Sequence, residues 1–467
     1  MLTPAIPGPL QGQPRRRVNP DLGSIEGAAR AQRAGTVTSV ALVERCLAAI
    51  EARNTELNAY IRVTGQEALA EARERDQELR AGHDRGPLHG IPVSLKDLID
   101  LAGQPTTAAS RVREGHVARA DATVVTRLRR AGAVVLGKTN LHEFAFGTTN
   151  EESAFGPARH PVDPTRSPGG SSGGSAVSVA TGMALASVGT DTGGSIRIPA
   201  AACGLVGLKP TSGEVPVDGV VPLSTSFDHV GPLCRSVADA RMMFDVLRGG
   251  DGSTSAAPVV ASDVRARALR GYFFAQVDDE VAASVEAALS RISSAGVRVS
   301  DTTIDGTDAI GPVYLHVSLP EAVAYHAATL EQVPEQYTPG VRTRLEAGRY
   351  VLAEDYVRAQ HGRTVLRRAV DDALSGYDVL VLPALAIPAP PLGAATMRVS
   401  GKDEPVRGLM LRLTQLFNIT GHPAITLPCG VTRAGLPIGV QLVGHHGRTH
   451  ALLNVAEAIE AIIASAR

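Results

Sequence analysis

Two segments rich in glycine and serine contain hydroxyl groups that could act as nucleophiles. Residues 167–175 read Ser-Pro-Gly-Gly-Ser-Ser-Gly-Gly-Ser, and residues 189–199 read Gly-Thr-Asp-Thr-Gly-Gly-Ser-Ile-Arg-Ile-Pro. Such runs are usually flexible linkers, but both are joined directly to apolar segments here. We therefore expect both in the core, where Gly193 and Gly194 leave backbone N–H groups free to converge on an oxyanion.

A serine nucleophile needs a base within hydrogen-bond reach, and a lysine is the candidate. Of the 46 Lys and Arg residues, only Lys96, Lys138, Lys209 and Lys402 are lysines. A buried lysine can lose its proton near neutral pH, whereas arginine cannot. Lys96 ends a short, mostly apolar strand predicted at 91–95, so it is the candidate base. Lys402 is predicted at the surface, and Lys209, before a Pro-Thr turn, is predicted to be structural.

Two motif matches suggest other chemistries and are disfavoured. Residues 132–139 match GxxxxGK[ST], but 133–136 is predicted to be a buried strand and not a loop that cradles phosphate. Residues 169–173 match GxSxG, but a nucleophile elbow must directly follow a buried strand, and 163–168 reads as a turn. His445 and His446 lie in a predicted turn and do not present themselves as a triad base.

The bulk composition narrows the class of protein. A net charge of −1, 3% aromatic residues and no Trp give no basis for nucleic-acid binding. The four cysteines are scattered, without metal-ligand spacing, and no motif for a metal or an organic cofactor is present. No signal peptide and no membrane-spanning apolar run is visible, so we expect a cytoplasmic protein with no membrane partner.

Alternating strand and helix patterns predict an α/β protein with a buried mixed sheet. Residues 1–20 are predicted to be a flexible tail, and 249–262 is the one candidate insertion or boundary. The expected strands are 91–95, 133–136, 185–188, 271–275, 297–299, 379–382, 425–427 and 438–443. The expected helices include 65–81, 122–131, 176–182, 237–248, 280–295, 354–373, 405–416 and 450–464, after two helical patterns in 24–58.

Several longer motifs, in order, resemble the amidase signature family over nearly the whole chain. These motifs are 88–97 (Leu-His-Gly-Ile-Pro-Val-Ser-Leu-Lys-Asp), 137–140, 167–175, 189–199, 204–211, 228–232 (Asp-His-Val-Gly-Pro), 417–424 and 435–441. The resemblance implies one domain at 21–467, with N-terminal helices at about 24–82 and a catalytic core at about 83–467. It implies a central mixed β-sheet covered by helices on both faces.

The resemblance also implies a Ser-Ser-Lys triad. Ser195 would be the acylated nucleophile, Ser171 the bridging serine after a cis bond from Gly170, and Lys96 the base. The backbone N–H groups of Thr192, Gly193, Gly194 and Ser195 would hold the oxyanion. Asp191 and Arg197 would brace the turn, and Ser172 would form hydrogen bonds near the triad.

The substrate is less defined. We expect a stand-alone amidase acting on small or aryl amides. Esters and carbamates are further candidate substrates, because the same acyl-enzyme route serves them. The alternative is the glutaminase component, known as the A subunit, of a tRNA-dependent amidotransferase, although 414–421 looks more like free-standing amidases. The sequence does not decide the oligomeric state, and a homodimer is one option. A non-enzymatic scaffold is disfavoured, since the lysine and both serines are retained. Phe144, Phe146 and Tyr314, with the loops 144–150 and 315–325, are candidates for the acyl pocket.

Overall fold

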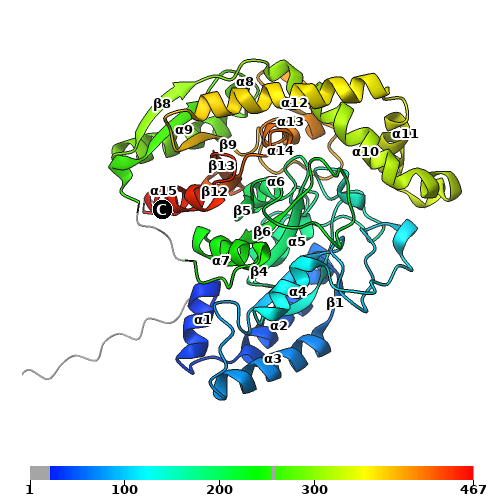
Figure 1. Ribbon diagram of the computed structural model, residues 1–467, viewed down its shortest axis with the longest axis vertical. Coiled ribbons are helices and arrows are strands. Elements are labelled where there is room, and N and C mark those ends of the chain that lie inside the picture. The colour runs from blue at the N-terminus through cyan, green and yellow to red at the C-terminus, as the bar shows by residue number, and fades with distance from the viewer. Residues whose placement is uncertain (1–21, 255–258, 466–467) are drawn as a thin grey trace, which may run out of the picture.

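The computed structural model describes residues 22–254 and 259–465, so the predicted tail at 1–20 lies outside the described residues. Within those ranges an 11-stranded mixed sheet runs in the order β1-β3-β2-β4-β6-β5-β12-β13-β9-β7-β8 (Figure 1). Its strands are β1 Tyr60–Val63, β2 Pro92–Lys96, β3 Val134–Thr139, β4 Ala186–Asp191, β5 Val206–Lys209, β6 His229–Cys234, β7 Arg265–Leu269, β8 Arg298–Thr302, β9 Val379–Pro383, β12 Ala424–Val431 and β13 Pro437–Val443. A hairpin of β10 Thr396–Val399 and β11 Lys402–Pro405 stands apart from it.

Helices cover both faces of the sheet, as the sequence predicts (Figure 1). They are α1 Ile25–Arg33, α2 Ser39–Leu57, α3 Gly65–Arg80, α4 Thr123–Arg130, α5 Gly173–Ala180, α6 Arg197–Cys203, α7 Val237–Arg248, α8 Tyr272–Ala275, α9 Asp279–Ser294, α10 Ile310–Gln332, α11 Pro339–Gly348, α12 Ala353–Leu374, α13 Val406–Leu411, α14 Leu416–Ile419 and α15 Thr449–Ala464. Helices α5 and α6 pack against each other and the sheet, while α15 packs against α7 and α9. None of the helices in the described part of the chain combines the length and apolar character needed to cross a membrane.

Chain order divides the sheet into two halves. The strands from β1 to β6 lie at one end of the strand order, and the strands from β7 to β13 lie at the other. The halves meet where β5 pairs antiparallel with β12, in the register Lys209↔Ala424. The candidate boundary 249–262 connects the halves in sequence, although its residues 255–258 lie outside the described ranges.

The strands that carry the site are buried along their whole length. Every residue of β2 and of β4 is buried, as expected for parallel strands covered on both faces. These two strands are parallel neighbours, with Leu95 opposite Val188. Their carboxyl ends, at Lys96 and Asp191, therefore lie at the same edge of the sheet.

Three predicted elements are wrong. The loop expected at 315–325 lies within the helix α10. The expected strand at 271–275 is the short helix α8, and the strand lies just before it, at β7. The alternating sequence Arg-Ala-Arg-Ala-Leu at 265–269 forms this strand, which pairs with β8 and β9. The expected helix at 405–416 is two helices, α13 and α14, because the chain between them turns to contact the Gly193 carbonyl.

Candidate active site

Lys96 lies at the end of β2 with its side chain fully buried. Its Nζ donates a hydrogen bond to Ser171 Oγ at 2.7 Å and another to Thr190 Oγ1 at 2.8 Å. Burial lowers the pKa of Lys96 to about 7, although the carboxylates of Asp191 and Asp228 favour the protonated form. A substantial fraction of this amine is therefore neutral near pH 7, as a general base requires.

Ser171 follows a cis peptide bond from Gly170. A Cβ on Gly170 would lie 2.8 Å from the backbone nitrogen of Asn150, so only glycine fits here. The next residue, Ser172, donates from its backbone N–H to the Ser195 carbonyl at 3.3 Å and from its hydroxyl to the Thr190 carbonyl at 3.2 Å. These bonds hold the segment that carries Ser171 against the backbone of Ser195.

Ser195 is buried, with 5% of its surface exposed. Its hydroxyl forms no hydrogen bond to any residue in the described ranges, and none joins it to the hydroxyl of Ser171. The structure thus brings Lys96 and Ser171 into direct contact and places Ser195 beside them through the backbone. Catalytic hydrogen bonds are often long in the absence of substrate and tighten in the complex.

The turn between Asp191 and Ser195 presents free donors. Within the described part of the chain, the backbone N–H groups of residues 192, 193, 194 and 195 have no acceptor, whereas those of Ile196 and Arg197 donate to Asp191 Oδ2. Successive unpaired N–H groups in a turn form an anion-binding concavity. Both glycines of this turn are crowded: a Cβ on Gly193 would lie 2.6 Å from Tyr314 Oη, and one on Gly194 would lie 2.2 Å from Thr414 Oγ1.

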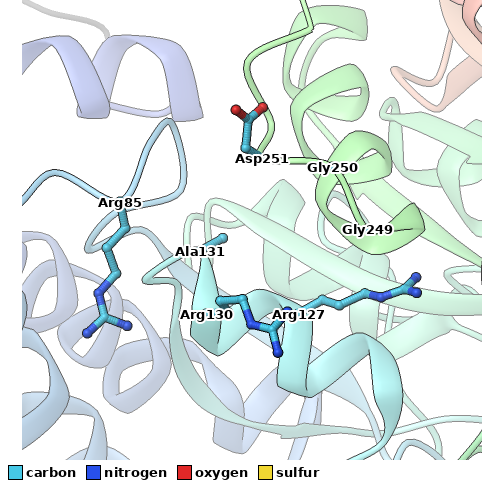
Figure 2. Close-up of a pocket in the computed structure, with 7 residues that line it drawn as sticks. All are labelled: Arg85, Arg127, Arg130, Ala131, Gly249, Gly250 and Asp251. Atoms are coloured by element: carbon cyan, nitrogen blue, oxygen red, sulfur yellow. The ribbon is translucent and has the colours of Figure 1, made fainter.

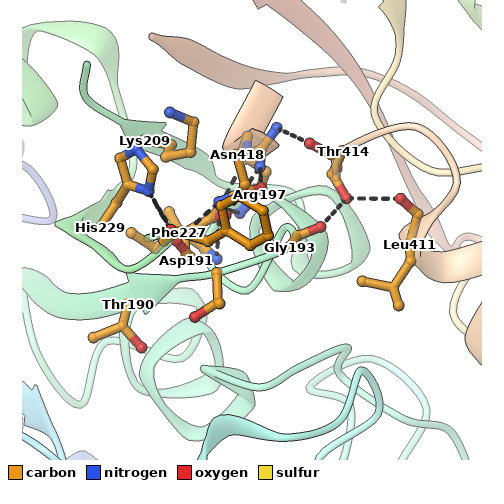
Figure 3. Close-up of polar contacts among 12 residues, drawn as sticks. Thr190, Asp191, Gly193, Arg197, Lys209, Phe227, His229, Leu411, Thr414 and Asn418 are labelled. Atoms are coloured by element: carbon orange, nitrogen blue, oxygen red, sulfur yellow. Dashed lines mark hydrogen bonds and ion pairs between the residues drawn. The ribbon is translucent and has the colours of Figure 1, made fainter. Parts of the chain in front are cut away.

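A buried ion pair supports this turn (Figure 3). Arg197 donates to both carboxylate oxygens of Asp191, at 2.9 and 3.0 Å, and both side chains are fully buried. The positive charge of Arg197 holds the pKa of Asp191 well below its usual range despite burial. The remaining donors of Arg197 reach the Thr414 carbonyl (2.9 Å), Gln441 Oε1 (2.6 Å) and Asn418 Oδ1 (2.6 Å).

Sequence reasoning missed several residues of this network. Thr190 contacts Lys96, and its position one residue before Asp191 in a strand signals that the two side chains point to opposite faces. Asp228 lies in the quoted motif 228–232; it accepts from Thr192 Oγ1 at 2.5 Å, and burial raises its pKa to about 6. Thr414 and Asn418 come from a distant part of the chain, and only their spacing of four residues in a helical pattern hinted that they share a face.

The disfavoured motif matches do not build a second site. The residues Val134–Thr139 of the GxxxxGK[ST] match form the buried strand β3, and Lys138 pairs with Asp97 at 2.8 Å. His445 Nε2 lies 2.7 Å from the Tyr377 carbonyl, away from the serines. No cluster of three or more His, Cys, Asp or Glu side chains suited to a metal ion occurs in the described ranges.

An arginine-lined pocket of about 280 Å³ lies near the ends of α4 and α7 (Figure 2). Arg85 donates to the Arg129 carbonyl and forms an ion pair with Glu78. Arg127 donates to the Leu247 carbonyl at 2.6 Å. Both arginines therefore bind carbonyls in the last turns of helices, where a cation is favourable, and this pocket is distinct from the serine site.

The fold is matched in proteins of one family. A family model described as Amidase matches residues 41–453. The chain belongs to the amidase family, which confirms the resemblance seen in its motifs, and members of this family cleave C–N bonds.

Similar proteins include both an amidase and an amidotransferase subunit. The chain is 41% identical to an amidase of Pseudomonas putida, over 88% of this chain and 90% of that protein. It is 38% identical to the A subunit of the glutamyl-tRNA(Gln) amidotransferase from Koribacter versatilis, over 92% of this chain and 96% of that protein. Among solved structures, an amidase that is 37% identical superposes with a TM-score of 0.89, covering 94% of this chain and 99% of that one.

Proposed function

We propose that this chain hydrolyses carboxylic amide C–N bonds through an acyl-enzyme on Ser195, with Ser171 as the proton relay and Lys96 as the base. The observation that carries the proposal is the 2.7 Å contact between Lys96 Nζ and Ser171 Oγ in a site sealed from solvent. A lysine so placed can be neutral, and a neutral amine can accept a proton through the intervening hydroxyl.

The steps follow from the donors and acceptors of the site. As Ser195 Oγ attacks the carbonyl carbon, its proton passes to Ser171 and the Ser171 proton passes to Lys96. The free N–H groups of residues 192–195 stabilise the oxyanion. The proton returns through Ser171 to the leaving nitrogen, the C–N bond breaks, and water then hydrolyses the acyl-enzyme. Small and aryl amides fit this scheme, as do esters and carbamates.

Of the three residues proposed for the acyl pocket, Tyr314 lies at the catalytic turn, because a Cβ on Gly193 would come within 2.6 Å of its Oη. Its ring stacks on Phe227, with centroids 5.7 Å apart. Phe144 packs edge-on against His326 and lines a separate cavity with Arg113 and Tyr325. We therefore assign Tyr314 to the substrate side of the turn and Phe144 to a supporting role.

The second candidate is the glutaminase component of a tRNA-dependent amidotransferase. The observation that favours it is the 38% identity to the A subunit of such an enzyme over nearly the whole chain. The same triad would serve both functions. They differ in whether the chain works without partners. A glutaminase component should be nearly inactive when purified alone and should co-purify with the other chains of its complex.

The test is turnover of p-nitroanilides, primary amides, glutamine and aryl carbamates by the purified chain, with mass spectrometry of the acyl adduct. Ser195→Ala should lower kcat/KM at least ~1,000-fold and abolish the adduct. Ser293→Ala, on the exposed side of α9, is the control and should match the wild type. Wild-type turnover by Ser195→Ala would remove Ser195 as the nucleophile, and inactivity of the free chain towards every amide would favour the glutaminase component of a complex.

A further inference from the structure

Arg407 is a partly buried cation with no carboxylate partner among the described residues. The one hydrogen bond of its side chain is a long one, 3.4 Å, from Nη1 to the Phe146 carbonyl, and its guanidinium lies 5.8 Å from the centre of the Phe146 ring. The nearby Arg344 is different, because it forms an ion pair with Glu152 at 2.6 Å. Charges that are shielded from water are normally paired with an opposite charge. Arg407 has no such ion pair with the protein, and the carboxylate of a ligand could form it.

The helix that carries Arg407 faces the catalytic turn. Arg407 and Leu411 are four residues apart in α13 and therefore lie on one face of it. A Cβ on Gly193 would lie 3.1 Å from Leu411 Cδ2 and 2.6 Å from Tyr314 Oη, so both side chains lie against this turn. Arg407 is thus one helical turn from a residue in contact with the proposed oxyanion site.

The surroundings of Arg407 are suited to an anion. Tyr314 contributes a hydroxyl that has no hydrogen-bond partner in the described ranges. Burial and the positive charge of Arg344 lower the pKa of Arg407 to about 10, although Tyr314 and the Glu152 carboxylate raise it, so Arg407 remains charged at neutral pH. A planar guanidinium binds a carboxylate through two parallel hydrogen bonds.

We propose that Arg407, with the Tyr314 hydroxyl, binds a carboxylate of the substrate, so that the preferred substrates are half-amides of short dicarboxylic acids. The scissile amide lies at Ser195, and the carboxylate lies at Arg407, one helical turn before Leu411 in α13. This inference rests on the proposed amide hydrolysis and narrows its substrate class.

The test compares glutaramate with its neutral isostere glutaramide, and succinamate with succinamide. We expect the wild type to favour each half-amide by ~10-fold or more in kcat/KM, as a charge-assisted contact would give. Arg407→Met, which keeps the stem against Phe146, should bring this ratio close to one while retaining turnover of the neutral amides. Arg412→Met is the matched control: Arg412 extends from α13 towards Tyr272, where it covers the ring at 3.7 Å, and its loss should leave the ratio unchanged.

A binding measurement separates this inference from the proposed function. Glutarate should raise the melting temperature of the wild type and of Arg412→Met, but not that of Arg407→Met. Equal turnover of charged and neutral amides by the wild type, or a preference that survives Arg407→Met, would overturn the carboxylate site while amide hydrolysis stands. If glutarate binds through Arg407 and no amide is hydrolysed, the site stands and the proposed function fails.

Discussion

At the scale of single residues, most of the few lysines of this chain are buried. Lys96, Lys138 and Lys209 are fully buried, while Lys402 lies exposed in the β10–β11 hairpin, as the sequence predicts. The three buried lysines differ in their surroundings. Lys138 pairs with Asp97, and Lys96 contacts two hydroxyls. Burial lowers the pKa of Lys209 well below its usual value. Only the arrangement of Lys96 couples an amine to the proposed proton relay, Ser171.

The pH dependence of activity should report Lys96 directly. Because the proposed mechanism needs the neutral amine and its pKa is lowered to about 7, kcat/KM should rise as the pH increases through about 7 and level off above it. The measurement is a pH profile of amide turnover between about pH 5 and 9.

Lys96→Arg provides the matching substitution. The guanidinium stays protonated across this range, so activity should fall nearly as far as in Lys96→Ala. Circular dichroism would check that both variants fold. A profile that is flat through neutral pH in the wild type, or an active Lys96→Arg enzyme, would contradict the role of Lys96 as the base.

At the scale of elements, the segment between α13 and α14 determines how the catalytic turn is aimed. Thr414 Oγ1 donates to the Gly193 carbonyl at 2.6 Å, and the Thr414 carbonyl accepts from Arg197 at 2.9 Å. In a trans peptide the carbonyl and the following N–H point in opposite directions. Holding the Gly193 carbonyl on Thr414 therefore directs the N–H of Gly194, one of the free donors of the turn, to the opposite side.

Thr414→Val should lower kcat by about 10-fold or more with little change in KM, because the proposed oxyanion donor would be less well fixed. It should also cost about 1–3 kcal/mol of stability, since the Gly193 carbonyl loses its partner. Thr414→Ser should restore both. Steady-state kinetics, the affinity for an aldehyde that forms a tetrahedral adduct, and urea unfolding are the measurements.

Thr426→Val is the control for this change. Thr426 lies buried in β12, and its hydroxyl has no hydrogen-bond partner among the described residues. The same loss of a hydroxyl there should leave kcat unchanged and should not destabilise the protein. If Thr414→Val and Thr426→Val behaved alike in kcat and in aldehyde affinity, Thr414 would have no positioning role.

At the scale of the whole molecule, the proposed triad lies entirely in the first half of the chain, but its support comes from the second. Lys96, Ser171 and Ser195 precede the stretch 249–262, whereas three acceptors of Arg197 are Thr414, Asn418 and Gln441. The two halves of the sheet meet at the β5–β12 pair. An isolated first half would expose the edge of β5 and leave the buried Arg197 without these acceptors.

A fragment of residues 22–254 should therefore be inactive and poorly folded, although it contains every proposed catalytic side chain. Co-expression with residues 259–467 should restore at least part of the amide turnover by completing the sheet. Turnover assays and far-UV circular dichroism of the fragment, alone and with its complement, provide the check. Activity of the first fragment by itself would show that the C-terminal acceptors are dispensable.

The sequence by itself determined the class of fold, the family and the residues worth testing. Buried strands read as apolar runs because both of their faces are covered, and glycine–serine runs between such strands belong to the core. Motifs of contiguous residues, such as 189–199, carry this information locally.

Only the tertiary structure decided which distant residues complete the site. Thr190, Asp228, Thr414, Asn418 and Arg407 owe their roles to contacts between segments that are far apart along the chain, and local patterns did not identify their partners. The break between α13 and α14 has the same origin, because a hydrogen bond to Gly193 outweighs the helical preference of 405–416. Helix propensity contributes only tenths of a kcal/mol per residue, so one buried contact is enough to override it.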